Sequence, residues 1–256
     1  MARIIALLFG IAAYGVFFLT FLYLIGFIGN LVVPKSIDAG PASPALSALL
    51  INLGLIGLFG LQHSAMARQG FKARWKRIVP ASVERSTYVL ISSAVLILLF
   101  WLWQPMGQVV WNVEAPWART LMWSLFAAGF VIVLLSTFNI DHFDLFGLRQ
   151  VLANLRRSAY RHPRFQVTWF YRFVRHPLYS GFILAFWATP TMTLGHLLFA
   201  AAMTTYIFIA IRYEERDLLA FHGDAYREYR ERVPALVPLP GGSHERVDAN
   251  DQVGSY

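Results

Sequence analysis

Long apolar stretches alternate with shorter polar connections along the chain. Six stretches stand out, and all but the last approach or exceed the ~20 residues with which a helix crosses the hydrocarbon core of a membrane. They cover residues 4–33, 45–67, 86–103, 117–138, 178–194 and 197–211. The pattern predicts an all-α integral membrane protein with about six transmembrane segments. Because the last two are short and closely joined, they form either a tilted hairpin or two upright spans.

Composition supports the membrane assignment. Charged residues make up 14% of the chain and hydrophobic residues 57%, whereas soluble domains carry about 25% charged residues. The chain has no cysteine, which excludes a disulfide scaffold, a thiolate zinc site and a catalytic cysteine. We expect no metal site.

The formal net charge is +8, and its placement predicts an orientation. Apart from Lys35 and Arg119, the lysines and arginines lie at the N-terminus, in the second and fourth connections, or after the last span. The positive-inside rule therefore places both termini in the cytoplasm. Basic loops of this kind contact lipid headgroups. They resemble no nucleic-acid-binding motif, so we expect no nucleic-acid partner.

Two polar regions outside the spans also favour helices. Leucines recur at helical spacing opposite arginines in the fourth connection, at Leu145, Leu148, Leu152, Leu155, Arg149, Arg156 and Arg157. This predicts an amphipathic helix at the cytoplasmic interface, either a lipid anchor or a lid. Gly223 reads as the end of one helix and Asp224 as the cap of a C-terminal cytoplasmic helix that ends at Val233. We expect one domain over residues 1–240 and a disordered tail over 241–256.

Ionisable side chains gather at one depth of the predicted bundle, at the cytoplasmic ends of four segments. They are His63, Asp141, His142, Arg175, His176, Glu214 and Glu215. Such residues at a membrane bundle are costly and usually functional, and together they would line a pocket open to the cytosol. Each also has a purely structural interpretation: an interfacial histidine, a helix cap or a solvated ion-pair network. A channel is disfavoured because the spans carry few polar residues along their length.

The start of the fifth segment suits an anion. Pro177 fits the first turn of a helix, where its missing N–H costs nothing. Free backbone amides at a helix N-terminus favour negative charge, and Arg175 and His176 add side-chain donors for a carboxylate. Gly181 would let a ligand or another helix approach the backbone closely.

The C-terminal third carries an ordered set of motif residues. In sequence order they are Arg175, His176, Pro177, Tyr179, Gly181, Glu214, Glu215, Phe221, Gly223, Tyr226, Tyr229, Val233 and Pro234. The set resembles the signature of the isoprenylcysteine carboxyl methyltransferase and phospholipid methyltransferase membrane superfamily. It covers about residues 170–240, with His222 as a departure. Residues 61–68, 84–90 and 141–150 resemble the bacterial methanethiol S-methyltransferase family, a branch close to the NnrU-like proteins.

The resemblance implies an enzyme of the bacterial inner membrane that uses S-adenosylmethionine. The implied reaction methylates a small thiol, methanethiol, to dimethyl sulfide, with hydrogen sulfide as a second acceptor. The cofactor half would be residues 170–240. Such a transfer needs positioning, exclusion of water and a thiolate nucleophile rather than a metal. The sequence leaves the oligomeric state open.

We expect the motif residues to hold the cofactor. Arg175 and His176 would bind its carboxylate, and Glu214 or Glu215 its ammonium or a ribose hydroxyl. The aromatic and small residues Tyr179, Tyr226, Tyr229 and Gly181 would line the adenine or sulfonium region, where cation–π attraction is available.

The acceptor half needs a way to generate thiolate. An alkyl thiol titrates above the cysteine reference of about 8.5, so a base or an electropositive pocket is required at neutral pH. The candidate bases are His63 and His142, the latter oriented by Asp141. Arg149 is a candidate stabiliser of the thiolate.

Three other functions remain open on the sequence alone. A lipid or isoprenylcysteine carboxyl methyltransferase would share the cofactor half. A sterol-type membrane reductase would bind a nicotinamide cofactor in the corresponding region. An NnrU-like protein without enzymatic activity, or a structural bundle, would bind neither cofactor.

Overall fold

A computed structural model describes residues 1–41, 43–160 and 169–238. The elements are α1 (Ala2–Gly29), α2 (Ala45–Ala67), α3 (Gln69–Trp75), α4 (Ala81–Leu102), β1 (Val109–Asn112), α5 (Pro116–Ile140), α6 (His142–Leu145), α7 (Leu148–Arg156), the 3-10 helix η1 (Trp169–Arg172), α8 (Pro177–Trp187), β2 (Thr191–Thr193), α9 (Leu194–His222) and α10 (Asp224–Arg232). The predicted tail, residues 241–256, lies outside the described residues.

Among the described residues, five helices are long and apolar enough to cross a membrane: α1, α2, α4, α5 and α9. This confirms an integral membrane protein. The last two predicted segments differ from what the hydropathy suggested. Helix α8 has only 11 residues, about 16 Å or half the hydrocarbon thickness. Helix α9 has 29 residues and continues past the apolar run into a charged segment, where it packs against α10.

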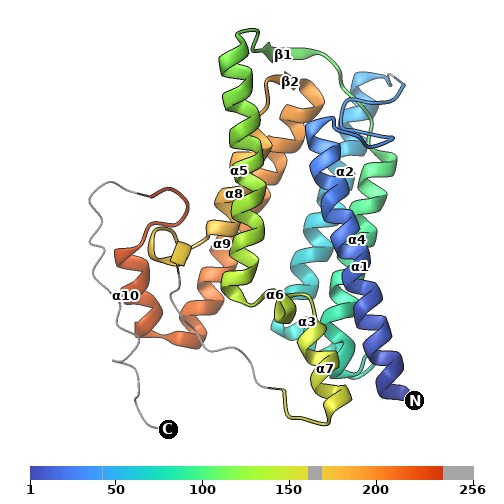
Figure 1. Ribbon diagram of the computed structural model, residues 1–256, viewed down its shortest axis with the longest axis vertical. Helices are drawn as coiled ribbons and strands as arrows, with labels where there is room; N and C mark the ends of the chain where they lie inside the picture. Colours follow the sequence, from blue (N-terminus) through green and yellow to red (C-terminus); the bar gives the residue numbers. More distant parts are fainter. Residues whose placement is uncertain (42, 161–168, 239–256) are drawn as a thin grey trace.

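The helices form an elongated bundle whose two ends differ (Figure 1). The N-terminus, α3, α7 and α10 lie at one end, whereas β1 and β2 lie at the other. Helix α5 packs along α8, α1 along α4, and α2 against both α4 and α9. The expectation of an all-α fold needs one correction, since β1 and β2 pair antiparallel with Val109 opposite Thr193.

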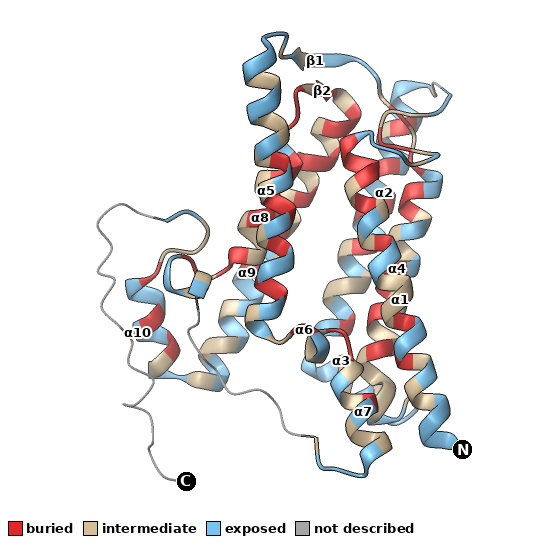
Figure 2. Cartoon of the chain, in the orientation of Figure 1, coloured by how far each residue is buried: buried red, intermediate tan, exposed pale blue. Residues whose placement is uncertain are grey.

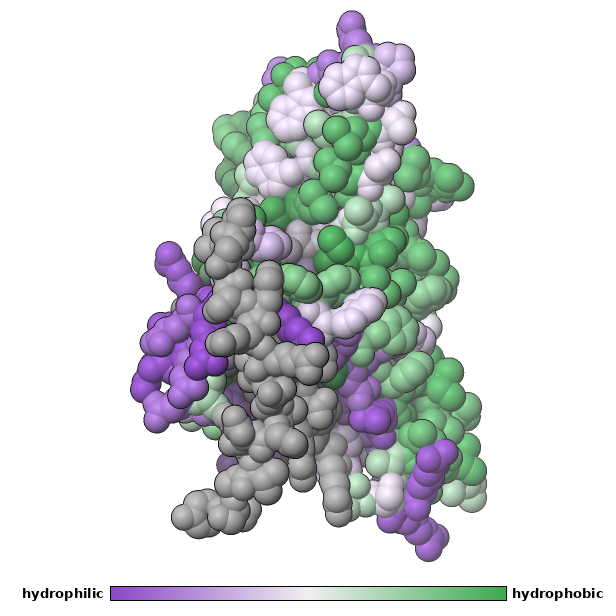
Figure 3. Space-filling model, turned by 60° about the vertical axis from the view of Figure 1, so that its left-hand side comes forward, coloured by the Kyte–Doolittle hydropathy of each residue, from purple (hydrophilic) through white to green (hydrophobic). Residues whose placement is uncertain are grey.

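An aromatic core joins the two sides of the bundle toward the strand end. Phe27, Phe100 and Trp103 pack there against Phe199 and Phe186. The outer faces of the helices are exposed and yet apolar, as the burial and hydropathy views show (Figures 2 and 3). An apolar exterior over such a core is what contact with lipid requires.

Glycines bring α5 and α8 into close contact. A Cβ atom at Gly129 would lie 2.7 Å from the Gly181 carbonyl oxygen, and one at Gly181 would lie 2.6 Å from the Gly129 carbonyl oxygen. Gly181 is therefore needed for helix packing. Of the two possibilities that the sequence left open for Gly181, the structure shows the close approach of another helix, and a contact with the cofactor stays a prediction.

The predicted amphipathic helix is present as α7, and it packs onto α1 and α4. Val151 on α7 is fully buried and lies against Gly10 of α1. Arg85 Nε donates to the Leu145 carbonyl oxygen at 2.9 Å. Gly147 has φ +89° and lies against Ser86, where a side chain would collide with the α4 backbone. Tight packing of this kind distinguishes α7 from a helix that only rests on lipid.

Helix α10 follows the predicted boundaries closely. Gly223 ends α9 with φ 57°, and α10 ends at Arg232 with Val233 as its C-cap. Asp224 is the first residue of α10, and Gly223 occupies the cap position that the sequence assigned to Asp224.

Candidate active site

An ion-pair cluster lies where the start of α8 meets α9. The Glu215 carboxylate accepts from Arg175 at 2.8 Å (Nε) and 2.7 Å (Nη2), and it lies 3.1 Å from His176 Nε2. Arg230 on α10 lies 4.0 Å from its other oxygen. Pro177 opens α8 at its first position, as expected, which places His176 at the N-cap. The side chains of Glu215 and Arg175 are about one-tenth exposed, so Glu215 is committed to balancing buried positive charge.

The rest of the Arg175 guanidinium holds the chain that follows α10. Its Nη1 donates to the carbonyl oxygens of Arg230 and Val233. The backbone amides of Arg175 and His176 donate to Pro234 and Ala235 at 2.8 and 3.0 Å. The sequence predicted that Arg175 grips a carboxylate. These bonds occupy most of the guanidinium N–H groups, and the carboxylate-binding role stays a prediction.

Glu214 lies beside this cluster but is differently placed. Its carboxylate accepts from the Tyr179 hydroxyl at 3.0 Å and lies 3.9 Å from His176 Nδ1. Its side chain is 47% exposed, against 12% for Glu215. Of the two glutamates, Glu214 is therefore the one that a cationic ligand could reach.

Tyr226 and Tyr229 lie in a separate small core between α9 and α10. They are 1% and 6% exposed and pack with Val233. The Tyr229 hydroxyl donates to the Tyr171 carbonyl oxygen at 2.7 Å. Burial, aided by the negative charge of Glu215, raises the pKa of Tyr226 to about 12. Both tyrosines attach α10 to the bundle, and their contact with a cofactor stays a prediction.

His63 lies on α2 among hydroxyl groups from α4. The Tyr88 hydroxyl is 3.0 Å from Nδ1 and 2.9 Å from Nε2 of the ring. Ser92 Oγ lies 3.3 Å from Nδ1, and the Phe59 ring stacks on the imidazole at 5.2 Å. The imidazole is thus held by Tyr88 and Ser92 on α4 and by the Phe59 ring on α2.

Tyr206 on α9 connects the His63 region with Glu214. Its hydroxyl accepts from Ser64 at 3.3 Å, and its ring lies against the backbone at Gly60. Tyr206 and Tyr88 both lie within electrostatic range of Tyr179, the residue that bonds to Glu214. Side chains of α2, α4, α8 and α9 therefore lie within electrostatic range of one another, and we call this set the tyrosine region (His63, Tyr88, Tyr179, Tyr206 and Glu214).

His142 lies elsewhere and is fully engaged. Its Nε2 is 2.8 Å from the Tyr14 hydroxyl of α1, and its Nδ1 is 2.8 Å from Thr137 Oγ1 of α5. The ring is 4% exposed and stacks flat on Phe138 at 4.3 Å. Burial lowers the pKa of His142, although the negative charge of Asp141 opposes the shift.

Asp141 does not orient His142, contrary to the expectation from their adjacency. Its side chain accepts from the Asp144 amide at 3.1 Å and so caps α6. It also pairs with Arg149, whose side chain is 54% exposed. Thr137 and Tyr14 take the orienting role instead.

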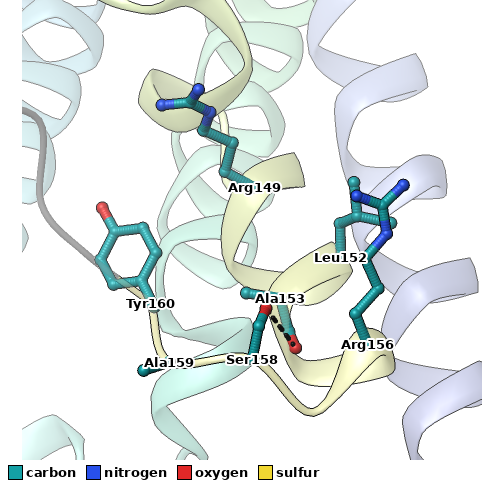
Figure 4. A pocket seen from close by; sticks show the side chains of 7 residues that line it. All are labelled: Arg149, Leu152, Ala153, Arg156, Ser158, Ala159 and Tyr160. Atoms are coloured by element: carbon teal, nitrogen blue, oxygen red, sulfur yellow. Dashed lines mark hydrogen bonds between the residues drawn. The ribbon is translucent and has the colours of Figure 1, made fainter.

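Arg149 contributes to a shallow depression on α7 rather than to the tyrosine region. The depression has a volume of about 210 Å³ and is lined by Arg149, Leu152, Ala153, Arg156, Ser158, Ala159 and Tyr160. Figure 4 shows the Arg149 and Arg156 side chains pointing toward different sides. This divergence, and the ion pair with Asp141, leave no convergent charge for a thiolate.

Sequence reasoning assigned no role to Tyr206, Thr137 and Tyr14, nor to Tyr88, although Tyr88 lies in the segment 84–90 that carries the family resemblance. In the sequence they read as ordinary aromatic and small polar residues of apolar helices, and only the packing reveals their partners. In the part of the chain that the structure describes, no group of three or more histidine and carboxylate side chains is placed to bind a metal.

Comparisons with known proteins agree on one family. The family model "NnrU protein" matches residues 50–228. A methanethiol S-methyltransferase of Mycobacterium tuberculosis is 52% identical over 94% of this chain and 98% of that protein. Methanethiol S-methyltransferase 1 of Bradyrhizobium diazoefficiens is 53% identical over 92% of this chain and 83% of that protein. Nurim of Xenopus laevis is 30% identical over 65% of this chain and 61% of that protein. No solved structure matches the chain.

Proposed function

The chain belongs to the NnrU protein family, and from this premise we propose that it transfers a methyl group from S-adenosylmethionine to methanethiol, giving dimethyl sulfide. One observation carries the proposal: relatives named methanethiol S-methyltransferases share about half of their residues with this chain over more than nine-tenths of its length. Hydrogen sulfide is proposed as a second acceptor, with methanethiol as its product. We further propose that the protein lies in a bacterial inner membrane with both termini in the cytoplasm.

The residues at the start of α8 fit a cationic methyl donor. S-adenosylmethionine supplies, when bound, a methyl group on a positively charged sulfur. In our proposal the half-exposed Glu214 carboxylate binds the ammonium group or a ribose hydroxyl of the donor. Tyr179 holds Glu214 in place through its hydroxyl. Glu215 holds Arg175 and His176 in place beside Glu214 through its ion pairs.

Headspace gas chromatography tests the reaction. Cells that express the full chain and receive methanethiol should release more dimethyl sulfide than cells with an empty vector. Sulfide-fed cells should release methanethiol. Dimethyl sulfide at the vector level would contradict the proposal, and methylated lipids in its place would favour a lipid methyltransferase.

Calorimetry with S-adenosylhomocysteine tests the donor site. Glu214→Gln should weaken binding by roughly tenfold, since hydrogen bonds to charged groups contribute about 1.5–3 kcal/mol. Asp217→Asn is a matched control, because Asp217 lies on the same helix and pairs with Arg68. Equal affinity of the Glu214 variant and the unmodified protein would remove Glu214 from the site.

A further inference from the structure

The hydrogen bonds around His63 leave one ring nitrogen able to accept a proton. The Tyr88 hydroxyl lies 3.0 Å from Nδ1 and 2.9 Å from Nε2, and the Ser92 hydroxyl lies 3.3 Å from Nδ1. The Tyr88 hydroxyl can donate its own proton to the His63 carbonyl oxygen at 3.4 Å. A neutral imidazole carries one N–H. With that proton on Nδ1, bonded to these oxygens, and the Tyr88 proton on the carbonyl oxygen, no donor occupies the lone pair of Nε2.

A second polar residue supports this arrangement from behind. Gln62 Nε2 donates to Ser92 Oγ at 3.3 Å. Ser92 Oγ therefore accepts a hydrogen bond from Gln62 and keeps its own proton to donate to the Tyr88 hydroxyl oxygen. The chain of bonds from Gln62 through Ser92 to Tyr88 fixes the side of His63 that faces α4.

The charges around His63 suit an anionic sulfur. Arg85 on α4 lies 5.7 Å from the centre of the Tyr88 ring and acts electrostatically on His63. Lys72 on α3 interacts in turn with Arg85. The titratable groups that face the imidazole are thus Tyr88 and Arg85 from α4 and Tyr206 from α9, which touches the neighbouring Ser64. Positive charge at this place attracts a thiolate as it forms.

We propose that His63 is the general base for the thiol acceptor and that Tyr88 is the residue that positions it, an inference that rests on the proposed function. The S–H bond of the thiol breaks, and its proton moves to Nε2 of His63. The thiol sulfur bonds to the methyl carbon as the bond from that carbon to the donor sulfur breaks, and the donor sulfur keeps the electron pair. Two neutral thioethers result, and His63 returns the proton to water.

Two matched variants test the role of Tyr88. Tyr88→Phe removes the hydroxyl beside His63, and Tyr14→Phe removes the equivalent hydroxyl beside His142. The purified full chain is assayed for kcat and KM with methanethiol from pH 4 to 9, and S-adenosylhomocysteine affinity is measured by calorimetry. A melting curve of each variant shows whether it is folded.

We expect Tyr88→Phe to lower kcat roughly tenfold, within the range of a weakened general base. Loss of the oxygen that accepts from Nδ1–H makes His63 a weaker base, so the rise of kcat with pH should move to lower pH. KM and S-adenosylhomocysteine affinity should not change. Tyr14→Phe should leave kcat and the pH profile as they are.

His63→Gln serves as the second variant, for the case that Tyr88→Phe does not fold. It should lower kcat strongly and leave only the slow reaction of preformed thiolate, whose rate follows the thiolate fraction and so rises about tenfold per pH unit below the thiol pKa. Unchanged kcat and pH profile in either folded variant would overturn the proposal. An unmodified protein that forms no dimethyl sulfide would instead overturn the proposed function, before any variant is compared.

Discussion

His63 and His142 each lie beside a tyrosine hydroxyl, but the two tyrosines have opposite consequences. The Tyr88 hydroxyl lies near both nitrogens of His63 but can donate its proton to the His63 carbonyl oxygen, so no donor has to occupy the lone pair of Nε2. At His142, Thr137 donates its proton to the Leu134 carbonyl oxygen at 2.6 Å and so must accept from Nδ1. Tyr14 then donates to Nε2, and both nitrogens are occupied.

A histidine beside a hydroxyl is therefore not by itself able to act as a general base. A general base needs an available lone pair and access to substrate. His142 is buried and stacked on Phe138, and it bonds to α1 and α5 at once. It therefore joins helices, whereas His63 lies in the tyrosine region, which also contains Tyr179 and Glu214. Four measurements test this difference between His63 and His142.

Removing each imidazole should separate stability from catalysis. His142→Ala leaves a cavity and two unsatisfied hydroxyls, so we expect a loss of about 3 kcal/mol of unfolding free energy. His63→Ala should cost about 1 kcal/mol of stability but lower kcat by roughly 100-fold. Denaturant unfolding and dimethyl sulfide formation are measured on both proteins. If His142→Ala stays as stable as the unmodified protein yet loses turnover, the two roles are reversed.

The pH dependence of stability should report His142. Burial lowers its pKa in the folded state below the ordinary value of 6.5. The unfolded chain therefore binds the proton more readily than the folded protein does. The contribution of neutral His142 to stability is complete above the pKa of histidine in the unfolded chain. It is lost as pH falls below that value, with a slope of at most about 1.4 kcal/mol per pH unit. Melting temperatures at pH 7.5 and 5.5 should differ less for His142→Phe than for the unmodified protein; an equal difference would contradict a neutral buried His142.

The hydroxyl partners of the two histidines should contribute differently to stability, Thr137 more than Ser92. Thr137→Val removes the acceptor of the His142 Nδ1–H and should cost about 1.5 kcal/mol of stability, as for a buried donor left unsatisfied. Ser92→Ala should cost less, about 0.5 kcal/mol, because Tyr88 still serves His63. Thermal unfolding ranks the two variants. A larger loss for Ser92→Ala would place the more tightly bonded histidine at position 63.

The smallest effect concerns Asp141. Since it caps α6 and pairs with an exposed arginine, Asp141→Asn should cost about 0.5–1 kcal/mol. Turnover should be unchanged, and Arg149→Gln should behave alike, because neither side chain bonds to His142. A fall in kcat for Asp141→Asn alone would restore the role that the sequence suggested for Asp141.

Much of the fold could be predicted from hydropathy and punctuation. Apolar length gave α1, α2, α4 and α5, while Pro177 and Gly223 marked the start of α8 and the end of α9. The extent of α9 could not be predicted, because hydropathy indicates where lipid ends and not where a helix ends. Strands β1 and β2 have four and three residues and carry too little pattern to be recognised.

The site was predictable only where a motif carries it. The signature identified Glu214, Glu215 and His176, which the structure brings together. Tyr88 and Tyr206 could not be singled out, because a tyrosine in an apolar helix looks the same whether it fills a core or faces a substrate. Asp141 shows the reverse error: consecutive side chains leave a helix end in different directions, so neighbours in sequence need not bond.

The most direct test of the central claim follows the methyl group itself. The purified full chain is incubated with methanethiol and S-adenosylmethionine that carries a deuterated methyl group, and the headspace is analysed by mass spectrometry. We expect dimethyl sulfide that contains the deuterated methyl, formed by the unmodified protein and at a strongly reduced rate by His63→Gln. Dimethyl sulfide without the label, or none at all, would contradict it.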